Sequence, residues 1–121
     1  MLLIYLDNTV KERMTWRLVY QSNRLIKKYG VLGKVASRYL LAGYSVRVQS
    51  DYILASKQGS NLVIGVAIND KDVGELIDKI AAASKKFNRV PVIVLYGRNK
   101  WKDETINMIR EHGITYRLVR K

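Results

Sequence analysis

Residues 33–69 decide the fold, and they read GKVASRYLLAGYSVRVQSDYILASKQGSNLVIGVAIN. The stretch begins as a short helix and continues into residues 44–50, where apolar and polar side chains alternate as in a half-buried strand. A second strand at 53–57 and a turn at Gly59 lead into residues 62–68, which are continuously apolar. Such a run is typical of a central strand that is covered on both faces.

Two strand–helix–strand units follow this stretch along the chain. The first joins residues 62–68 to an apolar strand at 90–96 through a helix at 70–86, and the second adds a helix at 102–112 and a strand at 114–119. Such crossovers predict parallel pairing, whereas the short turns between the earlier strands predict antiparallel pairing. The fold class is therefore α/β, with a single domain built on a mixed sheet of about four to five strands flanked by helices on both faces.

The chain before this stretch predicts a long basic helix. Residues 10–29 place apolar side chains on one side and, on the other, the cations Arg13, Arg17, Arg24, Lys27 and Lys28. Residues 1–6 form a short apolar run for which we expect an edge strand or a hydrophobic staple, and residues 7–9 can cap the helix. A second group of cations is close in sequence and can extend the basic face: Lys34, Arg38 and Arg47.

The net charge indicates the class of partner. The chain carries 22 Lys and Arg against 10 Asp and Glu, a formal charge of +12 in 121 residues. A charge of this size favours a polyanion. The candidates are nucleic acid, with DNA first, and then an anionic membrane surface. We expect the nucleic acid as the partner, and no membrane. A merely solvated helix face is the competing interpretation, but such faces normally mix both signs, and Glu12 is the one acid near these cations.

Composition excludes several kinds of site. The chain has no cysteine, which excludes a disulfide framework, thiolate metal sites and a cysteine nucleophile. The single histidine, His112, cannot form a zinc site by itself. The apolar run at the N-terminus is too short for a membrane span and has no basic region before it, so we expect an intracellular, cytoplasmic and soluble protein.

The order of elements resembles a known family. A helix ending in Gly-Tyr, a strand, Asp51, an Ile-Leu-Ala strand, a turn and a buried strand are similar to the core of the restriction-endonuclease-like superfamily, the PD-(D/E)xK nucleases. Archaeal Holliday-junction resolvases and YraN-like proteins belong to it. The resemblance covers residues 33–69 well and 70–96 loosely. It implies a DNA partner and a homodimer.

The catalytic motif of that family is incomplete in this chain. The family holds a divalent metal with an Asp that opens the second strand and a Glu-x-Lys on the third. Asp51 matches the first position, but the second falls on Gly65-Val66-Ala67, where no side chain is ionisable. A hard ion such as Mg²⁺ needs carboxylate oxygens, so no catalytic or metal-binding residue is assigned. Residues that could replace the missing ligands beside Asp51 are Lys57, Asp70 and Glu75.

Within the single domain 1–121, we expect an N-terminal basic helix at 1–32 and a C-terminal helix and strand at 97–121, and the resemblance implies a nuclease-like core at 33–96. The expected function is nucleic-acid binding, most simply of DNA, by a catalytically degenerate restriction-endonuclease-like domain without a cofactor. One alternative is a metal-dependent, structure-selective DNA endonuclease that uses Mg²⁺ and displaced active-site residues. The other is an interaction module whose charge only aids solubility.

Aromatic side chains and a rival architecture complete the expectations. For Trp16 and Trp101 we expect core or partly buried positions rather than base stacking, and Tyr20 and Tyr52 are weaker candidates for stacking.

The first two helices and the following hairpin could instead form a winged helix. The later strand–helix–strand units have no place in that fold, which disfavours it.

Overall fold

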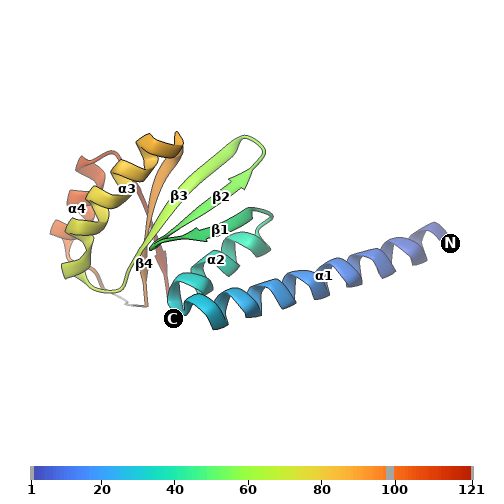
Figure 1. Ribbon diagram of the computed structural model, residues 1–121. Coiled ribbons are helices and arrows are strands. Elements are labelled where there is room, and N and C mark those ends of the chain that lie inside the picture. The colour runs from blue at the N-terminus through green and yellow to red at the C-terminus, as the bar shows by residue number, and fades with distance from the viewer. Residues whose placement is uncertain (1, 98–99, 121) are drawn as a thin grey trace.

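The computed structural model describes residues 2–97 and 100–120, with side chains from residue 16 onward. Within these residues, four α-helices, five strands and one 3₁₀ turn follow one another (Figure 1). They are α1 (Leu2–Tyr29), α2 (Val31–Leu41), β1 (Ser45–Gln49), β2 (Tyr52–Lys57), β3 (Ser60–Ala67), η1 (Asp70–Asp72), α3 (Val73–Phe87), β4 (Val90–Tyr96), α4 (Asp103–Glu111) and β5 (Thr115–Val119).

The five strands form one mixed sheet in the order β1-β2-β3-β4-β5. β1, β2 and β3 pair antiparallel, while β3, β4 and β5 pair parallel, with Ile64 opposite Val92 near the centre. The parallel partnership of the third strand with residues 90–96 was predicted from the strand–helix–strand pattern and is confirmed. The α/β class and the mixed sheet are confirmed with it.

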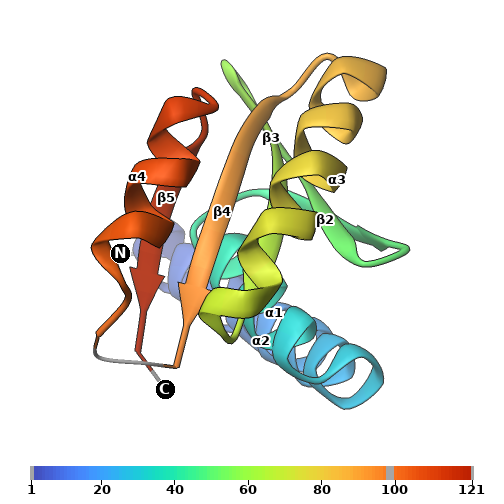
Figure 2. The same ribbon diagram turned by 90° about the vertical axis from the view of Figure 1, so that its left-hand side faces the viewer.

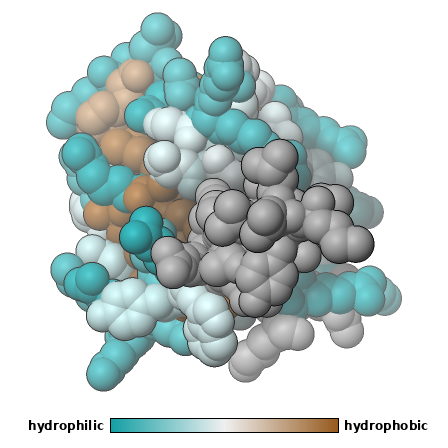
Figure 3. Space-filling model, turned by 90° about the vertical axis from the view of Figure 1, so that its right-hand side faces the viewer, coloured by the Kyte–Doolittle hydropathy of each residue, from teal (hydrophilic) through white to brown (hydrophobic). Residues whose placement is uncertain are grey.

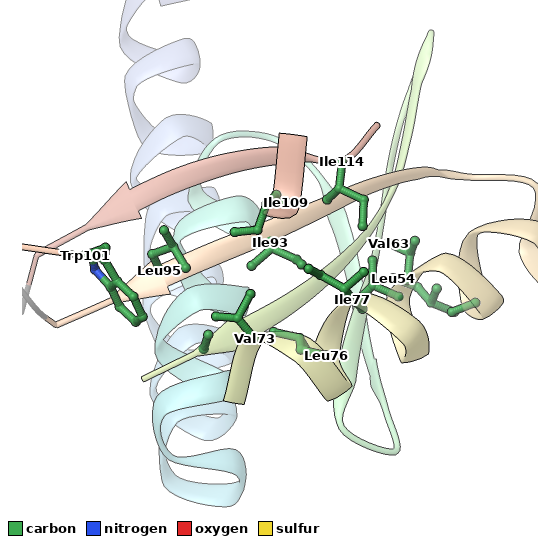
Figure 4. Close-up of a cluster of buried hydrophobic side chains, with 13 residues drawn as sticks. Leu54, Val63, Val73, Leu76, Ile77, Ile93, Leu95, Trp101, Ile109 and Ile114 are labelled. Atoms are coloured by element: carbon green, nitrogen blue, oxygen red, sulfur yellow. The ribbon is translucent and has the colours of Figure 1, made fainter. Parts of the chain in front are cut away.

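Helices cover both faces of the sheet, so two cores flank it (Figure 2). α3 and α4 pack on one face, where Val63, Ile77 and Ile93 are buried among their neighbours (Figure 4). α2 packs on the other face, over Ile53 and Ile64. Because successive strand residues point to opposite faces, the continuous apolar run of β3 supplies both cores at once.

α1 is longer than the sequence pattern indicated. The helix begins at Leu2, so the expected edge strand or staple is wrong for residues 2–6, and residues 7–9 lie inside the helix rather than cap it. Residue 1 lies outside the described part. No Gly or Pro occurs between residues 2 and 29, so nothing local ends the helix before Gly30. Figure 1 shows the N-terminal half of α1 extending beyond the sheet.

The junction of α1 and α2 depends on close backbone packing. Gly30 joins the two helices with a φ of 61°, a conformation that favours glycine. Gly33 is buried, and a Cβ added to it would lie 2.0 Å from the carbonyl oxygen of Leu25. The chain can therefore reverse direction here only because residue 33 has no side chain.

No helix in the described part of the chain is both long enough and apolar enough to cross a membrane.

Candidate nucleic-acid interface

The cations of the chain are unevenly distributed. Residues 13–50 contain eight Lys and Arg and no Asp or Glu, whereas the other 83 residues carry fourteen bases and ten acids. We call residues 13–50 the acid-free segment; it covers the C-terminal part of α1, all of α2 and β1. Since it contains no carboxylate to neutralise its cations, this segment supplies most of the net charge of +12.

Four of the five cations predicted on the first helix lie together. Their spacing of three, four and seven residues places them along one side of α1, and all four are exposed: Arg17, Arg24, Lys27 and Lys28. We call these four the basic side of α1. The opposite side faces the rest of the protein, since Ser22 is buried and Leu25 packs against the core under α2. The side chain of Arg13 lies outside the described residues.

Two aromatic side chains accompany the basic side of α1. Trp16 is 74% exposed and Tyr20 is 64% exposed, and the guanidinium of Arg24 lies 5.9 Å from the centre of the Tyr20 ring. The expectation of a buried or partly buried Trp16 is therefore wrong, because Trp16 lies on the side of α1 opposite to Leu25, which packs against the core under α2. Trp101, at 8% exposure, is buried as expected. Exposed aromatics among cations are the composition that stacks on bases and neutralises phosphates.

The second group of predicted cations is divided between two faces. Lys34 and Arg38 are exposed on α2, on the same face of the sheet as α1. Arg47 pairs with Leu54, whose side chain belongs to the core under α3 and α4, so Arg47 projects from the opposite face. Its guanidinium donates a hydrogen bond of 2.9 Å to the side chain of Gln49. The structure therefore does not bring Arg47 together with the α1 cations.

One cation beside α2 was missed from the sequence. Arg117 of β5 and Arg38 of α2 line one cavity of about 450 Å³, together with Tyr39. Burial raises the pKa of the Tyr39 hydroxyl, and the positive charge of Arg117 partly opposes this. The alternation of side chains along β5 could have shown on which face Arg117 lies. Residues two apart in a strand share a face, and Val119 packs against the core under α2.

A second cavity, of about 460 Å³, lies where α1, α2 and β1 meet. Two members of the basic side of α1, Arg24 and Lys28, line it on one side. Tyr29 and Tyr44 contribute aromatic surface, and the remaining lining mixes apolar and polar side chains. Figure 3 views the molecule from the side on which the N-terminal end of α1 projects. An apolar area is visible there among hydrophilic side chains.

The residues that match or could replace the nuclease motif lie apart. Asp51, in the turn between β1 and β2, accepts a hydrogen bond of 2.6 Å from the ammonium of Lys79 on α3, which lowers the pKa of Asp51. Lys57 lies at the other end of β2 and donates to the backbone oxygen of Ala42. Glu75 is exposed near the start of α3. Within the described residues, no three His, Cys, Asp or Glu side chains are placed to share a metal ion.

Asp70 has a structural role at the start of α4. One of its carboxylate oxygens accepts hydrogen bonds from the backbone N–H of Lys102 at 3.1 Å and from the hydroxyl of Thr105 at 2.7 Å. Backbone N–H groups in the first turn of a helix have no partner within the helix. Asp70 therefore ties the segment after β3 to the start of α4.

Gly65 is a packing position. An added Cβ would lie 2.7 Å from Ile80 and 2.7 Å from Leu76, both of which are buried side chains of α3. The absence of a side chain lets α3 approach β3 closely. Side chains of α3 therefore occupy the space in which the nuclease resemblance places a carboxylate.

No protein-family model matches the chain, and no curated protein is similar to it. Function is therefore inferred from charge and geometry. The exposed cations of α1 can neutralise phosphates, and the neighbouring aromatic rings can stack on bases.

Proposed function

We propose that this protein is a cytoplasmic nucleic-acid-binding protein that binds DNA through the basic side of α1 without cleaving it. The observation that carries the proposal is the exposed cluster of Arg17, Arg24, Lys27 and Lys28 within a segment that has no acid. Cations on an ordinary solvated face are balanced by nearby carboxylates. Here the balancing charge must come from a ligand or from counterions.

The exposed rings support nucleic acid over other polyanions. A polyphosphate or an acidic surface would use the cations but would gain little from Trp16 and Tyr20. Bases have flat faces that stack on such rings, with about 1–3 kcal/mol gained per base. The combination of rings and cations on one helix therefore favours a ligand that carries both bases and phosphates.

Binding without cleavage is supported by what occupies the nuclease positions. Gly65 is packed against α3, and Asp51 is paired with Lys79. The order of the strands, with a parallel pair formed by β3 and β4, supports our proposal that the domain is a degenerate member of the restriction-endonuclease-like class. A domain of this kind would retain a DNA-binding scaffold after losing its metal ligands.

A salt titration tests the proposal. The affinity for a fluorescently labelled DNA duplex is measured for the wild type, for Arg17→Ala with Lys27→Ala, and for the control Lys85→Ala with Lys86→Ala. If four or five cations reach phosphates, the logarithm of affinity falls with the logarithm of salt at a slope of about −4 to −5. The α1 double variant should flatten this slope by up to about two units and weaken binding to every DNA sequence alike.

The lysine pair of the control is exposed at the end of α3, where it suits the helix dipole. Its removal should leave the slope nearly unchanged. Equal affinities and slopes for the wild type and the α1 variant would show that the basic side of α1 is only solvated. The binding surface would then have to be sought elsewhere.

A further inference from the structure

The cavity between α1, α2 and β1 is built for more than a phosphate. Its volume of about 460 Å³ lies within the range of roughly 300–1,000 Å³ that is usual for small-ligand sites. Leu25, Leu40 and Val46 give it apolar walls. A site for phosphate alone would not need such walls, because an anion gains nothing from apolar contact.

Cations and aromatic rings occur together in the same cavity. Arg24 and Lys28 lie one helical turn apart on the α1 wall, and Tyr29 and Tyr44 also line it. The ammonium of Lys28 lies 5.3 Å from the centre of the Tyr29 ring. Interaction with a cation at this distance uses the face of the ring, which is also the part that stacks on a base.

One of the two rings is held in place before any ligand arrives. The hydroxyl of Tyr44 is hydrogen-bonded to the hydroxyl of Ser60 at 3.1 Å, and its ring meets that of Tyr39 edge to face at 5.5 Å. These contacts restrain the hydroxyl and the ring of Tyr44. A preorganised ring loses less conformational entropy when a ligand binds.

We propose that this cavity receives a single unpaired nucleotide of the bound nucleic acid. The base lies against Tyr29, Tyr44 and the apolar walls, while the phosphates on either side of it contact Arg24 and Lys28. This inference rests on the proposed function and adds a preference to it, because a base inside a double helix is stacked and cannot enter the cavity. The protein should therefore favour strands that carry an unpaired nucleotide.

The test compares two hairpins that differ in one feature. One is fully paired, and the other carries a single extrahelical 2-aminopurine, whose fluorescence reports its surroundings. The wild type should bind the second hairpin about 5- to 150-fold more tightly, the range that stacking of one base supplies, and the fluorescence should change on binding. Tyr29→Leu should lose most of this preference, and its affinity for the extrahelical hairpin should fall by a larger factor than its affinity for the paired hairpin.

Control variants separate the cavity from the rest of the interface. Tyr116→Leu removes another partly buried tyrosine, on the opposite face of the sheet, and should leave the preference intact. Arg17→Ala with Lys27→Ala, outside the cavity, should weaken binding of both hairpins by the same factor. Arg24→Ala with Lys28→Ala changes two exposed side chains, so it tests the cavity even if Tyr29→Leu fails to fold; it should reduce the preference as well as the overall affinity.

Each contrary result has a distinct meaning. Equal affinity of the wild type for both hairpins would overturn the inference and leave the proposed function standing. An unchanged preference in the Arg24→Ala, Lys28→Ala variant would also overturn it. Free 2-aminopurine ribonucleoside monophosphate binding as tightly as the extrahelical hairpin would replace it with a site for a small nucleotide. Absence of binding to either hairpin would instead refute the proposed function.

Discussion

The two ends of the chain use charge in different ways. In the part after residue 50, acids have partners or suitable positions: Asp51 pairs with Lys79, Asp70 binds the start of α4, and Asp103 begins α4. In the acid-free segment, the cations of α1 have no carboxylate within the segment to pair with. The first arrangement is explained by the fold itself. The second leaves cations for which the fold supplies no carboxylate within the segment, and this is the charge that the proposed ligand would balance.

The same two regions also differ in packing. α3 buries five residues against the sheet, whereas Ser22 is the one buried side chain among the described residues of α1. Substitutions in α3 should therefore affect stability, and substitutions on the basic side of α1 should affect binding. This separation makes the proposed interface accessible to mutagenesis.

The largest effect on stability is expected at Ile80 of α3, which is fully buried. Ile80→Ala removes apolar contacts and leaves a cavity, so the free energy of unfolding should fall by about 2–5 kcal/mol. Trp16→Ala, on exposed α1, should change it by no more than about 0.5 kcal/mol, although the side chain removed is larger. Urea denaturation followed by circular dichroism measures both. A loss at Trp16 as large as that at Ile80 would mean that α1 is covered in solution.

A smaller effect is expected at Gly65, where α3 crosses β3. Gly65→Ala places a methyl group against Ile80 and Leu76, and such overpacking costs about 1–3 kcal/mol. The matched control is Gly74→Ala, an exposed position of α3 where an added Cβ meets nothing within 4 Å. This control should stabilise the protein by about 0.4–1 kcal/mol, because alanine restricts the unfolded chain. Thermal denaturation of the two variants gives opposite signs if α3 packs as described.

Much of the fold could be predicted from the pattern of side chains. The apolar run that forms β3 and the helices between parallel strands determine the sheet, since period and connection length are local properties. The exposure of Trp16 and the sheet face of Arg47 were harder to predict from the sequence, and the reason is the same for both. Whether a side chain is covered, or which face of the sheet it shares with a distant helix, depends on how far that helix extends and where it crosses.

The candidate site was predicted in part. The cations of α1 were found because helical spacing alone places them on one side. The cavity was not found, because it needs Tyr44 and Val46 of the β1 region to meet α1, and no local pattern specifies that contact. The role of Gly65 was also hidden. A glycine within an apolar run indicates close packing in general, but not the helix that packs there.

The smallest effect concerns the ion pair that ties the β1–β2 turn to α3. The hydrogen bond from Lys79 lowers the pKa of Asp51 below its ordinary value of 3.8. A carboxylate whose pKa is lower in the folded state stabilises that state above its ordinary pKa, and the contribution disappears as pH falls through the lowered pKa. Asp51→Asn should therefore be slightly less stable than the wild type at pH 7, and the difference should vanish in strong acid.

Both groups of this pair are about half exposed, so solvent screens their attraction and the difference at pH 7 should be smaller than the loss at Gly65. Urea midpoints at neutral and acidic pH measure it, with Asp78→Asn, at an exposed carboxylate of α3, as the control. A difference that persists unchanged into strong acid would show that Asp51 acts through its hydrogen bonds to the backbone and to Ser50 in the turn rather than through its charge. In that case these local hydrogen bonds, and not the ion pair, would hold Asp51 in its present position.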